Sequence, residues 1–220
     1  EAVSPTDTDM RPMLTKVATG KPEFIYYPIF IAAGGHITRQ VKEVKGLEKV
    51  GLMGADGIFS PDLYKAACET AVCMYHSSPD FSAFAGGYKS FLENHKKKYG
   101  EAPLAPFHAH GYDAAMIIFA AIEKVAQKAP DGSLTIDRGK LRDALYATKG
   151  FKGLTGTINC DQYGDCADPK IGVYKTTAEN VKKLVMPDKP IWKPYVAAAP
   201  KAPAKAAPAK AAPAKAPAKK

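Results

Sequence analysis

The stretch Pro22–Gly57, PEFIYYPIFIAAGGHITRQVKEVKGLEKVGLMGADG, decides the fold. Its apolar, aromatic run Phe24–Ile31 predicts a strand that is buried on both faces. Ala33-Gly34-Gly35 is expected to turn the chain, and apolar residues at helical spacing follow it. Val50–Met53 is a second short apolar run. A strand, a helix and a strand within about 30 residues predict a βαβ unit, and such sheets bind ligands beyond the carboxyl ends of their parallel strands.

Helical and strand patterns alternate along the rest of the chain, so the predicted fold class is α/β. A second packing unit is expected after Pro79, and Ser77–Asp80 is expected to be a turn or a crossing between domains. Thr155–Asn159 and Ile171–Lys175 are predicted to pair as one hairpin. Helices are predicted over Met10–Thr19, Ser60–Thr70, Phe84–Tyr99, Ala109–Gln127 and Asp137–Ala147, with another strand over Val72–His76.

The charge of the chain is concentrated at one end. The 220 residues carry a net charge of +9, but residues 201–220 hold six lysines and no acid, so the remainder carries only +3. Ala197–Lys220 contains only Ala, Pro and Lys and is predicted to be an extended, disordered tail. Contact of this tail with anionic surfaces and a plain solubilising role are both open, and no specific nucleic-acid binding is predicted. No secretory signal precedes Glu1, so the chain is expected to be processed or truncated.

Asp56 and three aromatic residues are the candidate ligand contacts. Asp56 follows the second predicted strand, where a carboxylate could hold a ligand ammonium by charge-assisted hydrogen bonds. The alternative is an ordinary turn aspartate that bonds its own backbone. Tyr26, Tyr27 and Phe30 could form one wall of an apolar pocket, or they could be core residues.

His108 and His110, with Asp113 nearby, are similar to the His-x-His pair of some metal hydrolases. The pair precedes a predicted helix, so a role at the helix start is the alternative. No phosphate-binding loop and no nucleophile motif occurs in the sequence. We therefore expect no catalytic residue, no metal and no cofactor.

The four cysteines fall into two pairs. Cys160 and Cys166 flank the turn sequence DQYGD, and we expect them to form a disulfide in an oxidising compartment. Cys68 and Cys73 lie in a different unit and are expected to be free and buried, with a second bridge only weakly indicated.

The order of these motifs resembles the second half of a type I periplasmic binding protein, and most closely the branched-chain amino-acid binding group of ABC transporters. The resemblance covers nearly everything before the tail. It is carried by DTDMRPMLTKV, KPEFIYYPIFIAAGGHITRQ, GLMGADG, FSPDLYKAACETAVCMYHSSP, APFHAHGYDAAMIIFAAIEKV and KLRDALYATKGFKGLTGTINCDQYGDCADPKIGVY.

The resemblance implies a partial two-lobed fold with parallel sheets flanked by helices. It implies that an amino acid binds in the cleft and is delivered to a membrane permease in the periplasm, without catalysis. Phe30 lies where the family often has a ligand-contacting aromatic residue, and Asp56 lies where it places a carboxylate for the α-ammonium. The implied parts are residues 1–78 in the second lobe, 79–175 in the first lobe, a return segment 176–196 and the tail 197–220. Ser77–Pro79 and Thr176-Thr177 would be crossings between the lobes.

The departures from the family pattern are also informative. The segment with the Ser and Thr groups that bind the ligand carboxylate is absent, so we expect the chain alone to bind amino acids weakly or not at all. Cys68 and Cys73 stand where the family usually has glycine. A ligand-sensing ectodomain of the same fold, which regulates a partner protein, remains the alternative function.

Overall fold

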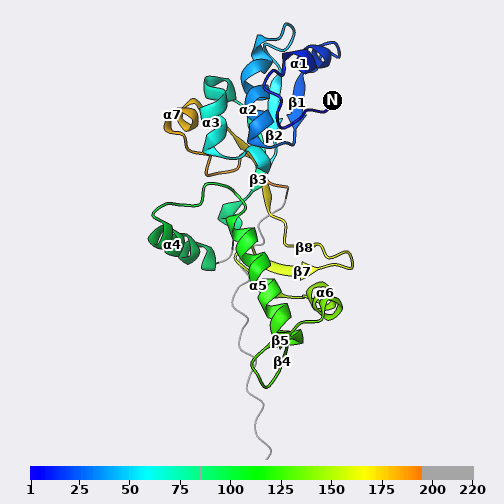
Figure 1. The fold of residues 1–220 in the computed structure, drawn as a ribbon. Coiled ribbons are helices and arrows are strands. Elements are labelled where there is room, and N and C mark those ends of the chain that lie inside the picture. Colours follow the sequence, from blue (N-terminus) through cyan, green and yellow to red (C-terminus); the bar gives the residue numbers. More distant parts are fainter. Residues whose placement is uncertain (85, 195–220) are drawn as a thin grey trace, which may run out of the picture.

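The computed structural model describes residues 1–84 and 86–194, so the predicted tail 197–220 lies outside the described residues. Figure 1 shows two units, which we call the first unit (residues 1–80 and 171–194) and the second unit (residues 81–170). The strands β3 (Tyr75–Pro79) and β9 (Ile171–Lys175) lie where the two units meet. The second unit is therefore inserted between two parts of the first.

A four-stranded sheet with the order β1-β2-β3-β9 builds the first unit. Its strands β1 (Phe24–Tyr27) and β2 (Gly51–Gly54) are parallel, with Tyr26 opposite Met53. β3 is parallel to β2, and β9 is antiparallel to β3. The predicted βαβ unit is thus present, with α2 (Ile31–Gln40) between β1 and β2. The other helices of this unit are α1 (Arg11–Ala18), α3 (Pro61–Ala67) and α7 (Ala178–Lys183).

The turn predicted at residues 33–35 is wrong, because these residues lie inside α2. The strand is correspondingly shorter than Phe24–Ile31 and ends at Tyr27. A Cβ atom on Gly34 would lie 2.8 Å from Ile58 Cγ2, and one on Gly35 would lie 2.7 Å from the Cβ of Ala66. The two glycines therefore allow close packing of a helix, and they do not turn the chain.

The hydrophobic core lies in the first unit. Ser60 begins α3 as predicted, because its side chain accepts a hydrogen bond from Asp62 N, and it places Leu63 and Tyr64 in the core. The buried cluster consists of Met10, Leu14, Tyr27, Ala33, Ile37, Val41, Val44, Leu47, Val50, Leu52, Ile58, Leu63, Tyr64, Ala67, Ala71 and Met74.

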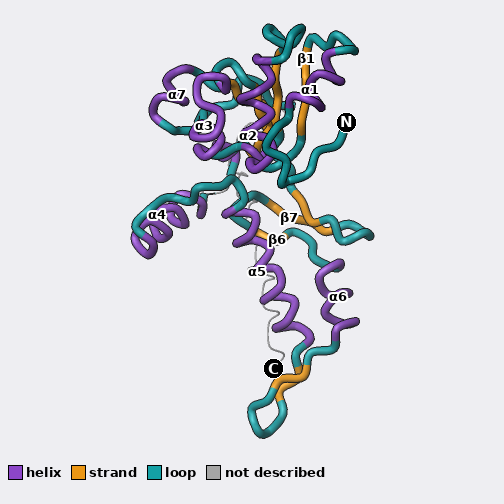
Figure 2. The backbone as a smooth tube through the Cα atoms, turned by 45° about the horizontal axis from the view of Figure 1, so that its top comes forward, coloured by secondary structure: helices purple, strands orange, loops and turns teal. Residues whose placement is uncertain are grey.

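The second unit is built around α5 (His108–Val125), which leads away from the first unit toward a small hairpin of β4 (Gln127–Lys128) and β5 (Leu134–Thr135) (Figure 2). α6 (Arg138–Tyr146) packs against α5, and Asp137 caps it as predicted by accepting from Lys140 N. The remaining elements are α4 (Gly87–Tyr99), β6 (Phe151–Lys152), β7 (Thr157–Cys160) and β8 (Cys166–Ala167).

The predicted hairpin of Thr155–Asn159 with Ile171–Lys175 is wrong. β7 pairs with β6 and β8, whereas β9 crosses to the first unit and pairs with β3. Ser77–Pro79 lies in β3 and is not a turn, so only the crossing alternative survives for it. Short 3-10 turns complete the described chain at Val41–Glu43, Asp56–Ile58, Cys68–Ala71 and Phe81–Ala83.

Within residues 1–84 and 86–194, none of the helices combines the length and the apolar character needed to cross a membrane.

Candidate functional site

Phe30 and Asp56 come together at the carboxyl edge of the sheet. Phe30 follows β1 and forms the N-cap of α2, and Asp56 opens the 3-10 turn that follows β2. A Cβ atom on Gly57 would lie 2.8 Å from the carbonyl oxygen of Ile29 and 3.2 Å from Phe30 Cδ1. The Phe30 ring therefore rests against the glycine next to Asp56.

Both side chains are available to a ligand. Phe30 is 73% exposed, which is unusual for a phenylalanine beside a core. Asp56 is half-buried, and within the described part of the chain its carboxylate makes no hydrogen bond and no ion pair. The self-bonded turn aspartate that the sequence left open is thus absent. The pair offers a carboxylate and an apolar ring side by side.

His110 lies on the first turn of α5, in the second unit, and is close to Asp56 of the first unit. Burial lowers the pKa of His110, and the charges of Asp113 and Asp56 oppose that effect. Asp56 therefore lies within electrostatic range of an imidazole from the other unit. The sequence offered His110 as half of a metal-binding pair or as a residue at a helix start, because no local pattern shows that the start of α5 lies near Asp56.

Tyr27 belongs to the core, which corrects its expected place on the wall of the pocket. The side chain is only 5% exposed, and its Oη is 2.7 Å from Thr38 Oγ1 and 3.5 Å from Met74 Sδ. Burial raises the pKa of this phenol above its ordinary value. Tyr26, the neighbouring residue, is 54% exposed.

The residues of the metal-hydrolase alternative are engaged elsewhere. His108 Nδ1 donates to the carbonyl of Ala105 at 2.8 Å, and its Nε2 accepts from Tyr88 Oη at 2.8 Å. Asp113 is 2% exposed and accepts from Leu154 N, Thr155 N and Thr155 Oγ1 at 2.7 to 2.8 Å. Among the described residues, no three His, Cys, Asp or Glu side chains are grouped to hold a metal. These residues serve packing and loop attachment.

A cavity of about 440 Å³ lies between the two units, apart from the residues predicted for the site. Phe30, Tyr27 and Asp56 do not line it. The residues that do line it include Phe59 and Pro61 from the first unit and Phe81, Tyr88, Leu92 and His108 from the second.

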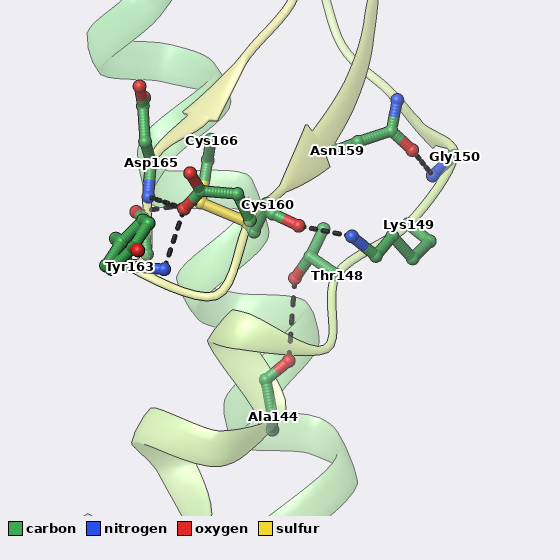
Figure 3. The surroundings of a disulfide bond; sticks show 11 residues. Ala144, Thr148, Lys149, Gly150, Asn159, Cys160, Tyr163, Asp165 and Cys166 are labelled. Carbon is green, nitrogen blue, oxygen red and sulfur yellow. Dashed lines mark hydrogen bonds between the residues drawn. A yellow bond between two sulfur atoms is a disulfide. The ribbon is translucent and has the colours of Figure 1, made fainter.

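The predicted disulfide between Cys160 and Cys166 is confirmed. Figure 3 shows that it closes the turn between β7 and β8, and that Lys149 Nζ donates to the carbonyl of Cys160 beside it. Cys68 and Cys73 are free, as expected, but the prediction that they are buried is wrong, because both are exposed. Their φ angles are 52° and 68°, a backbone region that favours glycine.

Comparison with known proteins identifies the family to which this fold belongs. A sequence profile of the family described as periplasmic binding protein matches residues 1–168. A Leu/Ile/Val-binding protein homologue of Brucella melitensis is 22% identical over 175 residues, which are 80% of this chain and 45% of that protein.

Two solved structures are also similar. A leucine-binding protein of Thermotoga maritima is 28% identical with a TM-score of 0.63, covering 78% of this chain and 46% of the other. A solute-binding protein of Rhodopseudomonas palustris in complex with 4-hydroxybenzoate is 16% identical with a TM-score of 0.65, covering 88% of this chain and 50% of the other, and shows the shared fold. The chain thus spans about half the length of these proteins or less. It belongs to the periplasmic binding protein family, and its fold is the α/β fold of that family.

Proposed function

We propose that this chain is part of the substrate-binding component of an ABC transporter for amino acids, with branched-chain amino acids as the favoured ligands. The observation that carries the proposal is the Asp56 carboxylate, which makes no hydrogen bond or ion pair with the described residues and lies beside the exposed Phe30 ring. The transporter would supply a membrane permease as partner, and the site of action would be the periplasm.

The two side chains match the two ends of a branched-chain amino acid. The α-ammonium would pair with Asp56 by charge-assisted hydrogen bonds, which are about twice as strong as neutral ones. The aliphatic side chain would cover the Phe30 ring and remove apolar surface from water, at roughly 25 cal/mol per Å². His110 would contact the ligand from the second unit.

The same geometry disfavours aromatic acids, which a relative from R. palustris is named as binding. A benzoate has no ammonium group, and its carboxylate would be repelled by Asp56. We therefore expect amino acids to bind in preference to 4-hydroxybenzoate, although the exposed Phe30 suits either kind of apolar group.

Calorimetric titration with leucine, isoleucine, valine, serine and 4-hydroxybenzoate tests the proposal. It should be made with this chain and with a longer protein that also carries the half of the relatives' length that this chain does not span. We expect weak or undetectable binding by this chain, because affinity in clamp proteins depends on closure around the ligand. The longer protein should bind the branched-chain amino acids best.

Asp56→Asn in the longer protein should weaken leucine binding by about tenfold or more, since a hydrogen bond to a charged group contributes roughly 1.5–3 kcal/mol. Asp62→Asn is the matched control, because Asp62 is an exposed acid that pairs with Lys65 on α3. Full leucine affinity in the Asp56 variant, or preference for 4-hydroxybenzoate, would refute the amino-acid assignment.

A further inference from the structure

A second cavity, of about 280 Å³, lies at the opposite edge of the sheet from Asp56. It is lined by Val50 and Gly51, where β2 begins, and by Met74 and Tyr75, where β3 begins. Lys175, at the end of the antiparallel β9, closes it, because Lys175 pairs with Tyr75 in the sheet. β2 has four residues, so roughly 13 Å of strand separates this cavity from the Asp56 edge.

Three lysines line this cavity, and no described carboxylate does. Lys42 Nζ donates to the carbonyl of Val50 at 2.6 Å, and burial lowers the pKa of this ammonium. Lys175 Nζ lies 5.4 Å from the centre of the Tyr75 ring. Over the described residues, no acidic side chain forms an ion pair with Lys42, Lys49 or Lys175. Glu48, which does not line the cavity, lies within electrostatic range of Lys49. Three positive charges around one concave surface with no carboxylate in its lining favour an anion.

Cys73 lines the same cavity. Cys73 is exposed and free, and its backbone N–H is bonded to the carbonyl of Thr176 at 3.0 Å, which fixes its place at the cavity edge. Cys68 is also exposed and free but does not line the cavity. The chain therefore contains one thiol inside the lysine cluster and a matched thiol outside it.

We propose that Lys42, Lys49 and Lys175 form a binding site for a small multivalent anion that carries phosphate or carboxylate groups, and that Cys73 is the reactive thiol of this site. The site is independent of the amino-acid assignment, because neither Phe30 nor Asp56 lines its cavity. The lysines raise the local concentration of anionic disulfides around this thiol. In exchange with a disulfide, the Cys73 thiolate attacks one sulfur, a mixed disulfide forms, and the other sulfur leaves as a thiolate.

The rates of the two thiols with Ellman's reagent, an anionic disulfide, test the proposal. Cys73 is followed in the Cys68→Ser variant and Cys68 in the Cys73→Ser variant, so each rate is assigned to one residue. We expect Cys73 to react about tenfold faster, since clefts of one charge sign raise the local concentration of the opposite sign by this order. Lys49→Gln with Lys175→Gln should remove most of the difference, and Lys183→Gln on α7 should not.

Inorganic pyrophosphate and citrate serve as ligand probes. Either anion should slow the reaction of Cys73 with the neutral reagent 2,2′-dithiodipyridine, whereas sodium chloride at the same ionic strength should not. The more effective anion identifies phosphate or carboxylate as the favoured group. Equal rates for the two thiols with Ellman's reagent, or protection that sodium chloride reproduces, would overturn the proposal. Circular dichroism of each lysine variant excludes loss of folding as the cause.

Discussion

At the scale of single residues, Asp113 is an anchor between α5 and the loop before β7. Its carboxylate accepts three hydrogen bonds from Leu154 and Thr155, and a Cβ atom on Gly153 would lie 2.5 Å from its Oδ2. From sequence, an aspartate three residues after a histidine pair could belong to a metal site or to a helix start. Only the position of residues 153–155, about 40 residues later, distinguishes the two roles.

Asp113→Ala should destabilise the protein by about 2–4 kcal/mol, because it leaves the three donors of Leu154 and Thr155 unpaired at a buried position. Urea unfolding measures the loss, and hydrogen exchange at the amides of Leu154 and Thr155 locates it. Asp137→Ala, which removes an ordinary helix cap, is the control at about 1 kcal/mol. A loss no larger than that of the control would contradict the anchoring role.

Cys68 holds a backbone conformation that suits glycine. Its φ of 52° and ψ of −139° lie outside the regions that residues with a Cβ atom adopt easily. Cys68→Gly should therefore stabilise the protein by roughly 1 kcal/mol. Cys68→Ser, which keeps the Cβ atom, should not, and thermal unfolding of the two variants compares them. Equal midpoints would show that the strain has been relieved elsewhere.

The candidate site was predictable in part at this scale. Asp56 could be named from the sequence because it follows a short apolar strand, where ligands of parallel sheets gather. Phe30 lay inside the predicted strand, and the family resemblance named it as the aromatic contact that follows this strand. Tyr27 could not be placed, since alternation shows only that Tyr26 and Tyr27 face opposite sides. His110 was missed as a partner of Asp56, because the two residues lie on units whose contact no local pattern encodes.

At the scale of elements, the glycines of α2 show why a local pattern misplaced a turn. Two consecutive glycines normally indicate a break in structure. Here the close approach of Ile58 and Ala66 requires residues without a Cβ atom inside a helix. The helix itself was predictable from its apolar spacing, but its first turn was not.

Gly35→Ala and Gly111→Ala should change stability in opposite directions, although both replace a helical glycine. At Gly35 the new Cβ atom would lie 2.7 Å from the Ala66 Cβ, and such overpacking costs about 1–3 kcal/mol. At Gly111 no atom of the described residues lies within 4 Å of the new atom, so the gain in helix propensity of about 1 kcal/mol is kept. Two variants that shift the urea midpoint in the same direction would contradict the close packing of α2 and α3.

At the scale of the whole molecule, the sequence predicted the α/β class and the family, but not how complete each unit is. The first unit has a hydrophobic core that its own residues form. The second unit leaves apolar side chains of its helices and hairpin exposed, including Phe119 at 58% and Leu134 at 60%. Amphipathic spacing shows that such faces exist but does not show what covers them.

His76 couples the stability of the molecule to pH. It lies on β3 with no exposed surface, and its Nε2 is 3.1 Å from Thr176 Oγ1, which also contacts Tyr64 Oη. Burial lowers the pKa of His76 from 6.5 to about 4. The unfolded chain therefore binds a proton below about pH 6.5 that the folded protein excludes until about pH 4. Stability should be fully present above pH 6.5 and should fall by roughly 3 kcal/mol as the pH drops to 4.

Urea unfolding of the wild-type protein and of His76→Gln isolates this contribution. The measurements run from about pH 7.5, above the unfolded pKa of His76, down to about pH 4, its folded pKa. The carboxylates titrate alike in both proteins, so their effect cancels in the difference. The free-energy difference between the two proteins should change with pH in the window from about 6.5 to 4. A difference that is constant across this window would mean that His76 is protonated in the folded state.

The position of β9 in the sheet has a consequence for synthesis on the ribosome. The first unit needs Ile171–Lys175 to cover the edge of β3, so its sheet stays open while about 90 further residues are translated. At 5–20 residues per second, that interval is roughly 5–20 s. During it, the nascent chain exposes an unpaired strand edge of the kind that other chains can join. Codon choice and chaperone access over residues 81–170 therefore bear on whether the first unit folds at all.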